Sequence, residues 1–432
     1  MLEFDLLVVG AGPAGASAAL VAARSGLRVA IFERGEAPGT KNVSGALLGT
    51  CALSRLLPQR WKEAPFERRI IRHSATFLAS SGALSLDLRR SHAPESTAPG
   101  YSIVRPRFDR WLAQQAVEAG ALLIPETVVD DLLWEGPRVV GVRARRDEGE
   151  VLAKIVIAAD GVNSILARRA RLRPDWRPSE VGLGLKETVR LPAEILEERF
   201  GIGPGEGAAM LFVGGLPEGV RGGGFLYTHR EGLSVGVVLH PDSAVASGVA
   251  TVDAFEAFKA HPAVARLLRG SVTLEYSAHL VPEGGVGNPR LFADGLMAAG
   301  DAAGLVLNTG VTVEGMDYAI ASGMAAGETA VEAIGRGDVS ARGLGTYRDR
   351  LEANGMLPAL RRFRRVPNLL CNPRLHGQYP EAAFCAVERW FAVDGRERRG
   401  LVRSAREALR GRIGVRQLLV DGLNAWRSLL WL

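Results

Sequence analysis

Cysteine, lysine and long apolar stretches are scarce in this 432-residue sequence. The three cysteines, Cys51, Cys371 and Cys385, are too few and too scattered to hold a four-cysteine iron–sulfur cluster or a zinc ion, so we expect no metal centre in this chain. They are expected to be free thiols in a reducing compartment. No apolar stretch has the length that spans a bilayer, and no signal peptide is recognisable. We therefore expect a cytoplasmic protein whose membrane contact, on the inner face of the cell membrane, is peripheral.

The positive charge of the chain comes mainly from arginine. The formal net charge is +6, and the lysines are few: Lys41, Lys62, Lys154, Lys186 and Lys259. No basic stretch is interleaved with aromatic residues, so nucleic acid is the poorest candidate partner, whereas an acidic protein or an anionic membrane surface stays open. With 47% hydrophobic and 23% charged residues, the composition is that of a globular protein larger than one average domain.

The N-terminal residues predict a strand, a helix and a second strand in direct succession. Residues 6–9 and 29–32 are apolar runs, and residues 13–25 are helical in pattern and rich in small side chains. The turn before the helix reads Gly-x-Gly-x-x-Gly, and a carboxylate follows the second strand. Such glycines allow a tight turn and close approach of a pyrophosphate at the helix N-terminus, while the carboxylate binds ribose hydroxyls. The predicted dinucleotide-binding residues here are Gly10, Gly12, Pro13, Ala14, Gly15, Glu33 and Arg34.

A second motif favours FAD over NAD as the dinucleotide. Residues 295–302 form an apolar strand that ends in Gly300-Asp301. Flavoproteins with two dinucleotide-fold motifs end a strand in this way, so that the carboxylate binds the ribityl or pyrophosphate part of the flavin and the next helix offers its amides. Together the two motifs predict an α/β protein with a glutathione-reductase-type, Rossmann-like FAD-binding domain.

Two more motifs fit a flavoprotein. Residues 155–159 are an apolar strand that runs into Asp160-Gly161, and a helix is predicted to begin near Arg105. These stretches resemble the Asp-Gly motif and the Arg-x-x-Phe-Asp-x-x-Leu helix of the hydroxylase and geranylgeranyl reductase branch of flavoproteins. The resemblance implies that Arg105 lies beside the FAD phosphates. The neighbouring charged residues are expected on a solvated helix face or in a helix cap: Arg107, Asp109 and Arg110.

The sequence becomes rich in glycine and in β-forming residues between residues 182 and 280. Strands are expected near residues 183–189, 209–213, 224–228 and 234–239. We interpret this stretch as a mixed β-sheet substrate domain inserted into the first domain. The FAD-binding domain is then discontinuous, over residues 1–71, 101–178 and 283–345, and the inserted domain covers 72–100 and 179–282. Residues 346–432 are expected to form a helical C-terminal region that contacts a partner or a membrane.

Five longer stretches follow one another in order along most of the chain: Lys41–Gly45, Leu185–Glu187, Gly222–Tyr227, Glu275–Gly285 and Gly300–Asp317. They resemble the electron-transfer-flavoprotein:quinone oxidoreductase family, and specifically its short FixC branch. This resemblance implies a FAD-dependent oxidoreductase that receives electrons from the α and β subunits of an electron-transfer flavoprotein and from a small ferredoxin-like iron–sulfur subunit. The acceptor would be a membrane quinone, menaquinone or ubiquinone, and the chain would be the quinone branch of an electron-bifurcating complex.

The same resemblance assigns roles to individual residues. Quinone would be bound in the inserted domain by Gly222, Gly223, Phe225 and Tyr227, because glycine lets a flat ring approach the backbone. On composition alone the two glycines also fit a flexible hairpin. The loop 304–317 would pack against the isoalloxazine ring. Further flavin-binding residues implied are Lys41, Ser44, Gly45, Val129, Gly310, Val311 and Thr312.

Two departures and one open role remain. The resemblance implies a basic residue at the position where this chain has Glu314, and this departure would change the local field near the flavin. Larger members carry a cysteine-rich cluster domain, and in the FixC branch a separate subunit supplies that cluster. We assign no catalytic residue firmly, because flavin and quinone perform the redox chemistry. Quinone reduction needs two protons, which Tyr227 or His279 could deliver; the alternative for His279 is a hydrogen-bonded structural histidine.

The C-terminal residues leave two readings open. Apolar residues recur at helical spacing over residues 413–432, after an arginine-rich stretch over residues 396–416. Such a stripe fits a helix that faces a subunit, and it also fits an interfacial helix that lies on a bilayer.

Two rival functions also stay open. One is a geranylgeranyl-reductase-like enzyme that saturates isoprenoid double bonds, although its Tyr-x-Trp-x-Phe-Pro stretch is replaced here by residues 224–228. The other is a non-catalytic, flavin-bearing scaffold subunit.

Overall fold

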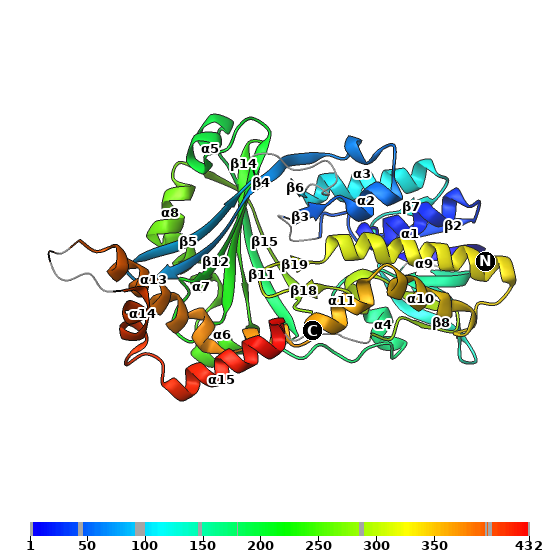
Figure 1. Cartoon of the computed structure of the whole chain (residues 1–432). Helices are drawn as coiled ribbons and strands as arrows, with labels where there is room; N and C mark the ends of the chain where they lie inside the picture. Colours follow the sequence, from blue (N-terminus) through cyan, green and yellow to red (C-terminus); the bar gives the residue numbers. More distant parts are fainter. Residues whose placement is uncertain are drawn as a thin grey trace. The chain divides into compact units, whose positions relative to one another are not determined.

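The computed structural model describes residues 3–41, 46–90, 100–145, 149–178, 180–284, 289–393, 395 and 400–430. The chain folds into two compact units, each assembled from separate stretches of sequence (Figure 1). Unit 1 comprises Met1–Phe66, Ala98–Arg177 and Pro282–Arg364, and unit 2 comprises Glu67–Thr97, Pro178–Val281 and Arg365–Leu432. Residues 346–432, which the sequence groups into one helical region, are therefore divided between the two units at Arg364.

Unit 1 is built on an eight-stranded sheet whose central strands are parallel. Its order is β16-β17-β10-β1-β2-β7, and the antiparallel pair β8 and β9 joins it through β10. The strands are β1 (Glu3–Val9), β2 (Val29–Phe32), β7 (Leu122–Ile124), β8 (Val129–Glu135), β9 (Arg138–Ala144), β10 (Glu150–Ala158), β16 (Phe292–Ala293) and β17 (Leu296–Ala298). Because β1, β2 and β10 are covered by neighbouring elements, they are apolar runs rather than alternating patterns.

Two helices rich in small residues pack closely against each other in unit 1. Helix α1 (Pro13–Arg24) begins with proline at its first position, and α9 (Met316–Arg336) ends at Gly337, whose φ of +70° suits glycine. A Cβ atom on Gly323 of α9 would lie 2.1 Å from the carbonyl oxygen of Ala14, and one on Gly327 would lie 2.7 Å from that of Ala18. Glycine at these positions therefore lets the α9 backbone approach that of α1.

The remaining elements of unit 1 surround this helix pair and the sheet. Helix α3 (Arg105–Glu118) packs on α1, and the short hairpin of β18 (Leu307–Asn308) and β19 (Val313–Glu314) precedes α9. The others are β3 (Ala46–Gly49), α2 (Cys51–Leu56), η1 (Trp61–Glu63), β6 (Gly100–Ile103), α4 (Ile165–Arg169), η2 (Gly300–Ala303), η3 (Gly343–Gly345), α10 (Thr346–Ala353) and α11 (Met356–Phe363).

Unit 2 is built on a mostly antiparallel sheet with the order β15-β11-β14-β13-β12-β4, and β5 pairs with β4. Its strands are β4 (Phe66–Ala79), β5 (Gly82–Arg89), β11 (Val181–Arg190), β12 (Glu206–Gly214), β13 (Gly222–His229), β14 (Gly232–Leu239) and β15 (Val272–Pro282). One pair in this sheet, β4 and β12, runs parallel. Each strand predicted within residues 183–239 is present and is longer than predicted.

One face of this sheet carries the apolar core of unit 2. Phe258 and Phe255, from a helix that follows the sheet strands, join the core with residues such as Leu226 and Val235. The helices before and after β12 to β14 are α5 (Ala193–Phe200), α6 (Pro241–Ser247), α7 (Thr251–Ala260) and α8 (Pro262–Leu268). These helices were missed in the sequence, where the glycine-rich strands dominated the pattern.

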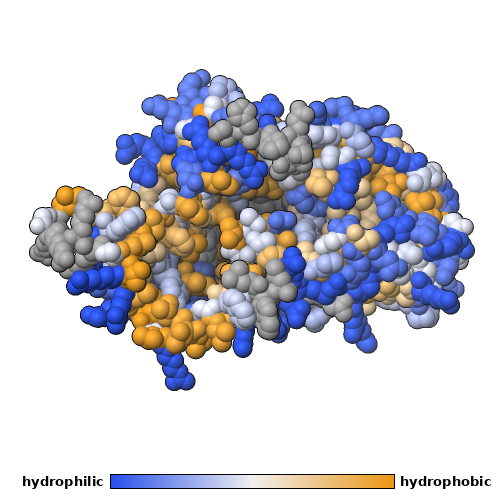
Figure 2. Space-filling model, in the orientation of Figure 1, coloured by the Kyte–Doolittle hydropathy of each residue, from blue (hydrophilic) through white to orange (hydrophobic). Residues whose placement is uncertain are grey.

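The C-terminal part of unit 2 is helical and exposes many apolar side chains. It contains α12 (Val366–Leu370), η4 (Pro373–His376), α13 (Gln378–Phe391), α14 (Leu401–Leu409), α15 (Val415–Ala425) and the π-helical turn η5 (Trp426–Leu430). Figure 2 shows apolar residues gathered where α15 lies in Figure 1. Across the described ranges, no helix combines the length and apolar character needed to cross a bilayer.

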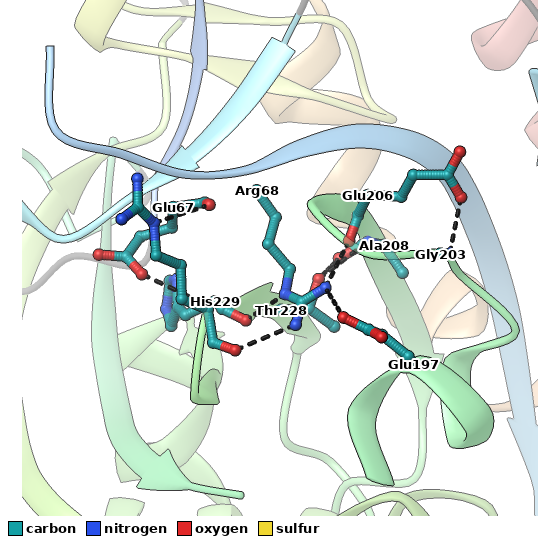
Figure 3. Close-up of polar contacts among 9 residues, drawn as sticks. Glu67, Arg68, Glu197, Gly203, Glu206, Ala208, Thr228 and His229 are labelled. Atoms are coloured by element: carbon teal, nitrogen blue, oxygen red, sulfur yellow. Dashed lines mark hydrogen bonds and ion pairs between the residues drawn. The ribbon is translucent and has the colours of Figure 1, made fainter. Parts of the chain in front are cut away.

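A buried arginine connects the strands and one helix of unit 2 (Figure 3). The Arg68 side chain is only 3% exposed, and its Nη1 atom lies 3.0 Å from the Glu197 carboxylate of α5. Its guanidinium also donates to three backbone carbonyl oxygens, at distances of 2.6–3.0 Å: those of Glu206, His229 and Arg230. A buried charge is tolerated when it is paired and fully hydrogen-bonded, so Arg68 holds β4, β12 and the β13–β14 turn together.

Candidate functional site

The parallel strands of unit 1 end side by side and define one edge of the sheet. Val9 of β1 is the register neighbour of both Phe32 of β2 and Ala158 of β10, and Ala158 is in turn the neighbour of Ala298 of β17. The residues after these positions therefore emerge at the same edge, which is where ligands bind in open α/β sheets. They include Gly10, Glu33, Asp160 and Asp301.

Each glycine of the first motif occupies its position for a different structural reason. Gly10 has φ +103°, and a Cβ atom on it would lie 2.3 Å from the carbonyl oxygen of Ala159. A Cβ atom on Gly15 would lie 1.9 Å from the carbonyl oxygen of Gly10, so helix and strand could not pack as closely. Gly12 differs, because among the residues that the structure describes a Cβ atom on it would meet only the Arg105 Nη2 atom, at 3.8 Å. The space beside Gly12 is thus open at the N-terminus of α1, as a phosphate site requires.

The carboxylate of Glu33 is buried and ties the glycine turn to the end of β2. It accepts hydrogen bonds from the backbone N–H of Ala11, at 3.0 Å, and of Gly35, at 2.7 Å, one on each oxygen. Each carboxylate oxygen can accept more than one hydrogen bond, so both keep capacity for a ribose hydroxyl. Arg34, the next residue, is exposed.

A partly buried arginine faces this edge. Arg105 donates from Nε and Nη2 to the two oxygens of Asp109, at 2.7 Å each. Burial lowers the pKa of Arg105, but the field and hydrogen bonds of Asp109, with weaker fields of Asp301 and Glu33, raise it above its usual value. The permanent cation is therefore held near the open space at Gly12. The prediction for Asp109 was wrong, because it is fully buried and orients Arg105, whereas Arg107 and Arg110 are exposed as expected.

Two carboxylates of the later motifs are held in sites that disfavour their charge. Burial raises the pKa of Asp160, against a hydrogen bond of 2.8 Å from the Ser164 hydroxyl, and burial also raises the pKa of Asp301, against the field of Arg105. Gly300 has φ +61°, and its N–H donates to Ser322 Oγ of α9 at 3.0 Å. Gly161 has φ +75°. The carboxyl groups of Asp160 and Asp301 follow neighbouring strand ends and can accept hydrogen bonds from ligand hydroxyls.

The loop after β18 forms a tight turn joined to a buried carboxyl. The Asn308 amide donates to Glu283 Oε2 at 3.2 Å and to the Glu283 carbonyl oxygen at 3.1 Å, and its Oδ1 accepts from the Gly310 N–H at 2.9 Å. Burial raises the pKa of Glu283 to about 7. Val311 and Thr312 at the tip are exposed. Glu283 was missed as a titratable group, because nothing in the Pro-Glu-Gly sequence shows that the side chain is buried.

The remaining residues that the sequence predicted to bind flavin are Lys41, Val129, Ser44 and Gly45. Lys41 is exposed and Val129 is buried at the start of β8. Ser44 and Gly45 lie outside the described residues. Glu314 is exposed on β19. Burial raises the pKa of nearby Asp317 to about 6, against a hydrogen bond of 3.0 Å from the Gly49 N–H.

The predicted quinone residues lie on β13 in unit 2, and they differ in which sheet face they occupy. Gly223, Phe225 and Tyr227 alternate with buried residues and share the face opposite the apolar core. The rings of Phe225 and Tyr227 stack at 5.2 Å, and a Cβ atom on Gly236, the cross-strand neighbour of Phe225, would lie 2.4 Å from the Phe225 ring. The face thus combines two aromatic rings with bare backbone.

The two glycines at the start of β13 are not equivalent. A Cβ atom on Gly222 would lie 2.3 Å from the carbonyl oxygen of Val238, so strand packing already requires glycine there. A Cβ atom on Gly223 would lie 3.1 Å from the Phe212 carbonyl oxygen, which is a milder conflict. Gly223 is therefore the better position for testing ligand approach without disturbing the strand.

Tyr227 and His279 do not meet. Tyr227 is on β13 and His279 on β15, and β14 and β11 lie between these strands. With neighbouring strands about 4.8 Å apart, the two backbones are separated by roughly 14 Å. Burial raises the pKa of Tyr227 to about 12, so its hydroxyl keeps its proton at neutral pH.

Comparisons with known proteins identify the family. Protein FixC of Salmonella typhi is 41% identical over 427 residues, covering 98% of both chains. The probable electron transfer flavoprotein-quinone oxidoreductase YdiS of Escherichia coli K12 is 41% identical over 431 residues, covering 99% of both. This chain belongs to the FixC/ETF-QO family. The family resemblance predicted from the motifs is confirmed.

Family models match both ends of this FixC-family chain. Residues 5–170 match the FAD dependent oxidoreductase model, and residues 366–430 match the ETF-QO/FixC family C-terminal domain. The chain is thus a FAD-dependent oxidoreductase of the FixC/ETF-QO family, and FAD is its cofactor, as predicted. The C-terminal match covers the helices of unit 2 from α12 to η5.

Solved structures confirm the predicted flavoprotein fold. A geranylgeranyl bacteriochlorophyll reductase-like protein of Thermoplasma acidophilum matches with a TM-score of 0.72 and 21% identity, covering 98% of this chain and all of that one. The myxobacterial chondrochloren halogenase CndH matches with a TM-score of 0.62 and 20% identity, covering 100% of this chain and 92% of that one. At these identities the likeness concerns the fold of the FixC-family chain alone.

Proposed function

We propose that this chain is the quinone-reducing subunit of an electron-transfer complex. In this proposal it takes electrons from the α and β subunits of an electron-transfer flavoprotein and from a small ferredoxin-like subunit, and passes them to menaquinone or ubiquinone as the quinone branch of an electron-bifurcating complex. The observation that carries the proposal is 41% identity, over nearly the whole length, to a protein named as a probable electron transfer flavoprotein-quinone oxidoreductase.

The FAD would be held by the strand ends of unit 1. The N–H groups of α1 and the cation of Arg105 would receive its pyrophosphate beside Gly12, because that space is open and lies next to the Arg105 guanidinium. Glu33 would bind the adenosine ribose, and the turn at Gly310 would present its backbone to the isoalloxazine ring. Bound FAD supplies the two-electron carrier of the reaction. The protein's part is to bind it, to orient it and to limit access of water.

The quinone would bind on the half-buried face of β13 that lies opposite the apolar core. Reduction of a quinone to a quinol consumes two electrons and two protons, so the site needs a flat surface and a proton source. Gly223 offers bare backbone and Phe225 an aromatic surface. Tyr227, which keeps its proton at neutral pH, could donate a hydrogen bond to one quinone oxygen, and His279 is the other candidate proton donor.

We also propose that α15 lies on the inner membrane surface, from which a long-chain quinone is drawn. Val415, Leu419 and Leu423 recur at four-residue spacing and are 45–76% exposed. Arg416 and Arg427 belong to the same helical stretch and could meet anionic head groups. An exposed apolar stripe with arginine beside it is the pattern of an interfacial helix, although a partner subunit would cover the same surface.

The test is reoxidation of the reduced flavin, followed by stopped-flow absorbance with a short-chain menaquinone or ubiquinone analogue. We expect fast reoxidation by wild type, and a raised quinone concentration for half-maximal rate in Gly223→Val, with unchanged flavin content. Gly335→Val is the matched control, because no atom of the described ranges lies within 4 Å of a Cβ atom there. Equal rates in both variants would remove β13 from the quinone site.

Two other outcomes would replace the proposal. Slow reoxidation by every quinone, together with saturation of a geranylgeranyl lipid, would make the chain a reductase of isoprenoid double bonds. Absence of both activities in the presence of bound FAD and of its partner subunits would indicate a flavin-bearing scaffold.

A further inference from the structure

A histidine of the C-terminal domain is bonded to the backbone of Gly222, far away in sequence. The ring of His376, at the end of η4, has Nδ1 at 2.8 Å from the Gly222 carbonyl oxygen and Nε2 at 2.7 Å from the Leu370 carbonyl oxygen. The same Nδ1 atom lies 3.3 Å from the Gly222 backbone nitrogen. The family model that matches residues 366–430 therefore covers a side chain that contacts the glycine pair.

The Nδ1 atom can bond Gly222 in two ways but not in both at once. When it carries hydrogen it donates to the carbonyl oxygen, and when it lacks hydrogen it accepts from the Gly222 N–H. Either bond restrains one of the two peptide groups that flank Gly222: the bond to the carbonyl oxygen restrains the peptide that joins Gly222 to Gly223, and the bond from the N–H restrains the peptide that joins Arg221 to Gly222. The backbone is therefore restrained directly before Gly223, the first residue of the β13 face opposite the apolar core.

Other polar contacts restrain the same strand start. Arg221 donates to the Cys371 carbonyl oxygen at 2.9 Å and to Asp242 at 2.6 Å. The His240 ring packs edge-on against His376, with 6.2 Å between ring centroids, and its Nδ1 has no hydrogen-bond partner among the residues described. Burial and then the field of Arg221 lower the pKa of His240 to about 4, so it is neutral beside His376 at physiological pH.

The short helix that carries His376 is also tied to α15. Arg374, two residues earlier, donates from Nε and Nη2 to both oxygens of Asp421, at 2.6 Å each, and Tyr379 donates to Asp421 at 2.9 Å. A bidentate arginine–carboxylate pair fixes orientation as well as distance. Contacts therefore run without a gap from α15 through η4 to the first peptide of β13.

We propose that His376 is a positioning residue through which the C-terminal domain sets the backbone at Gly222 and Gly223, and so the affinity of β13 for quinone. Through Arg374 and Asp421, the surface that α15 contacts is linked to the same two glycines. The inference rests on the proposed function for its ligand, but the backbone restraint at Gly222 can be measured without any quinone.

The first measurement is hydrogen exchange of the peptide that contains Gly222 and Gly223, in the full FAD-loaded chain. His376→Phe keeps a ring but removes both ring nitrogens, and we expect exchange there to rise by roughly tenfold, the factor that one buried hydrogen bond of ordinary strength provides. His261→Phe is the control. His261 also bridges two backbone groups of unit 2, the Ala79 oxygen at 2.9 Å and the Ala263 N–H at 3.2 Å, without touching β13.

The second measurement is reoxidation of the same variants by a short-chain quinone analogue. We expect His376→Phe to raise the half-saturating quinone concentration by roughly tenfold, with the rate at saturation and the flavin content unchanged, and His376→Gln, which can still donate to a carbonyl, to recover part of the loss. His261→Phe should leave that concentration as in wild type.

The outcomes separate this inference from the proposed function. Equal exchange at Gly222 in His376→Phe and His261→Phe would overturn the positioning role, whatever the quinone data show. Raised exchange in a protein whose wild type reacts with no quinone would keep the restraint at Gly222 and reject the quinone function. Raised exchange with unchanged quinone affinity would refute the link between the two.

Discussion

Replacing Asp421 by asparagine should loosen the C-terminal helix without affecting flavin binding. The Asp421 side chain is 7% exposed, and hydrogen bonds from Arg374, then from Tyr379, lower its pKa to about 2 from a usual value of 3.8. A difference of this size corresponds to about 2 kcal/mol of unfolding free energy at neutral pH. Because the carboxyl pKa is lowered on folding, this contribution is complete well above pH 4 and disappears as the pH falls towards 2.

The assay is denaturant unfolding at several pH values, with hydrogen exchange of Val415–Ala425 as the local probe. We expect Asp421→Asn to lower the free energy of unfolding of unit 2 by about 2 kcal/mol at pH 7 and by less at pH 3. Asp175→Asn is the control, since Asp175 is 80% exposed in its pair with Arg168 and such a pair contributes about 0–1 kcal/mol. An equal effect of both variants, or a loss that does not shrink at low pH, would contradict the reasoning.

Three further predictions concern other parts of the chain. Burial raises the pKa of Glu283 from 4.5 to about 7, so the wild-type protein should lose about 3 kcal/mol of unfolding free energy as the pH rises through this window. The Glu283→Gln variant, which has no carboxyl to ionise, should not show this loss. Equal pH profiles of the two proteins in urea unfolding would count against a buried carboxyl. Arg68→Leu should cost about 3 kcal/mol or more in urea unfolding because it leaves buried carbonyls unpaired, whereas Arg145→Leu, at an exposed ion pair, should cost less than about 1 kcal/mol. Leu419→Asp should weaken co-sedimentation with anionic lipid vesicles by roughly tenfold. Val245→Asp is the control, because Val245 is also exposed but lies on α6, and it should bind the vesicles as wild type does. Similar vesicle binding by the two variants would favour a partner subunit over lipid as the ligand of α15.

The flavin fold could be predicted from the sequence because its determinants are local. Gly15 is required by the carbonyl oxygen of Gly10 in the same turn, and the apolar runs before Gly10, Asp160 and Asp301 report strands buried on both faces. The parallel order of those strands then brings the motif ends together. FAD as cofactor followed from the pair of motifs, and the family comparisons confirm it.

What the sequence could not provide are contacts that depend on tertiary packing. Asp109 is separated by one helical turn from Arg105, and only burial turns that ordinary pair into the support of a cation at the phosphate turn. The bond between His376 and Gly222 joins residues far apart in the chain, and neither local pattern indicates it. Which residues touch FAD and quinone stays a prediction for both units.

The parallel pairing of β4 with β12 has a consequence for synthesis of the chain. Strand β4 ends at Ala79, and β12 does not begin until Glu206. At roughly 5–20 residues per second, the ribosome delivers that partner on the order of ten seconds later. Until then β4 can pair with β5, but the strand edge meant for β12 is uncovered in the nascent chain. A chaperone that shields this edge during translation should therefore raise the yield of native protein more than one added after release.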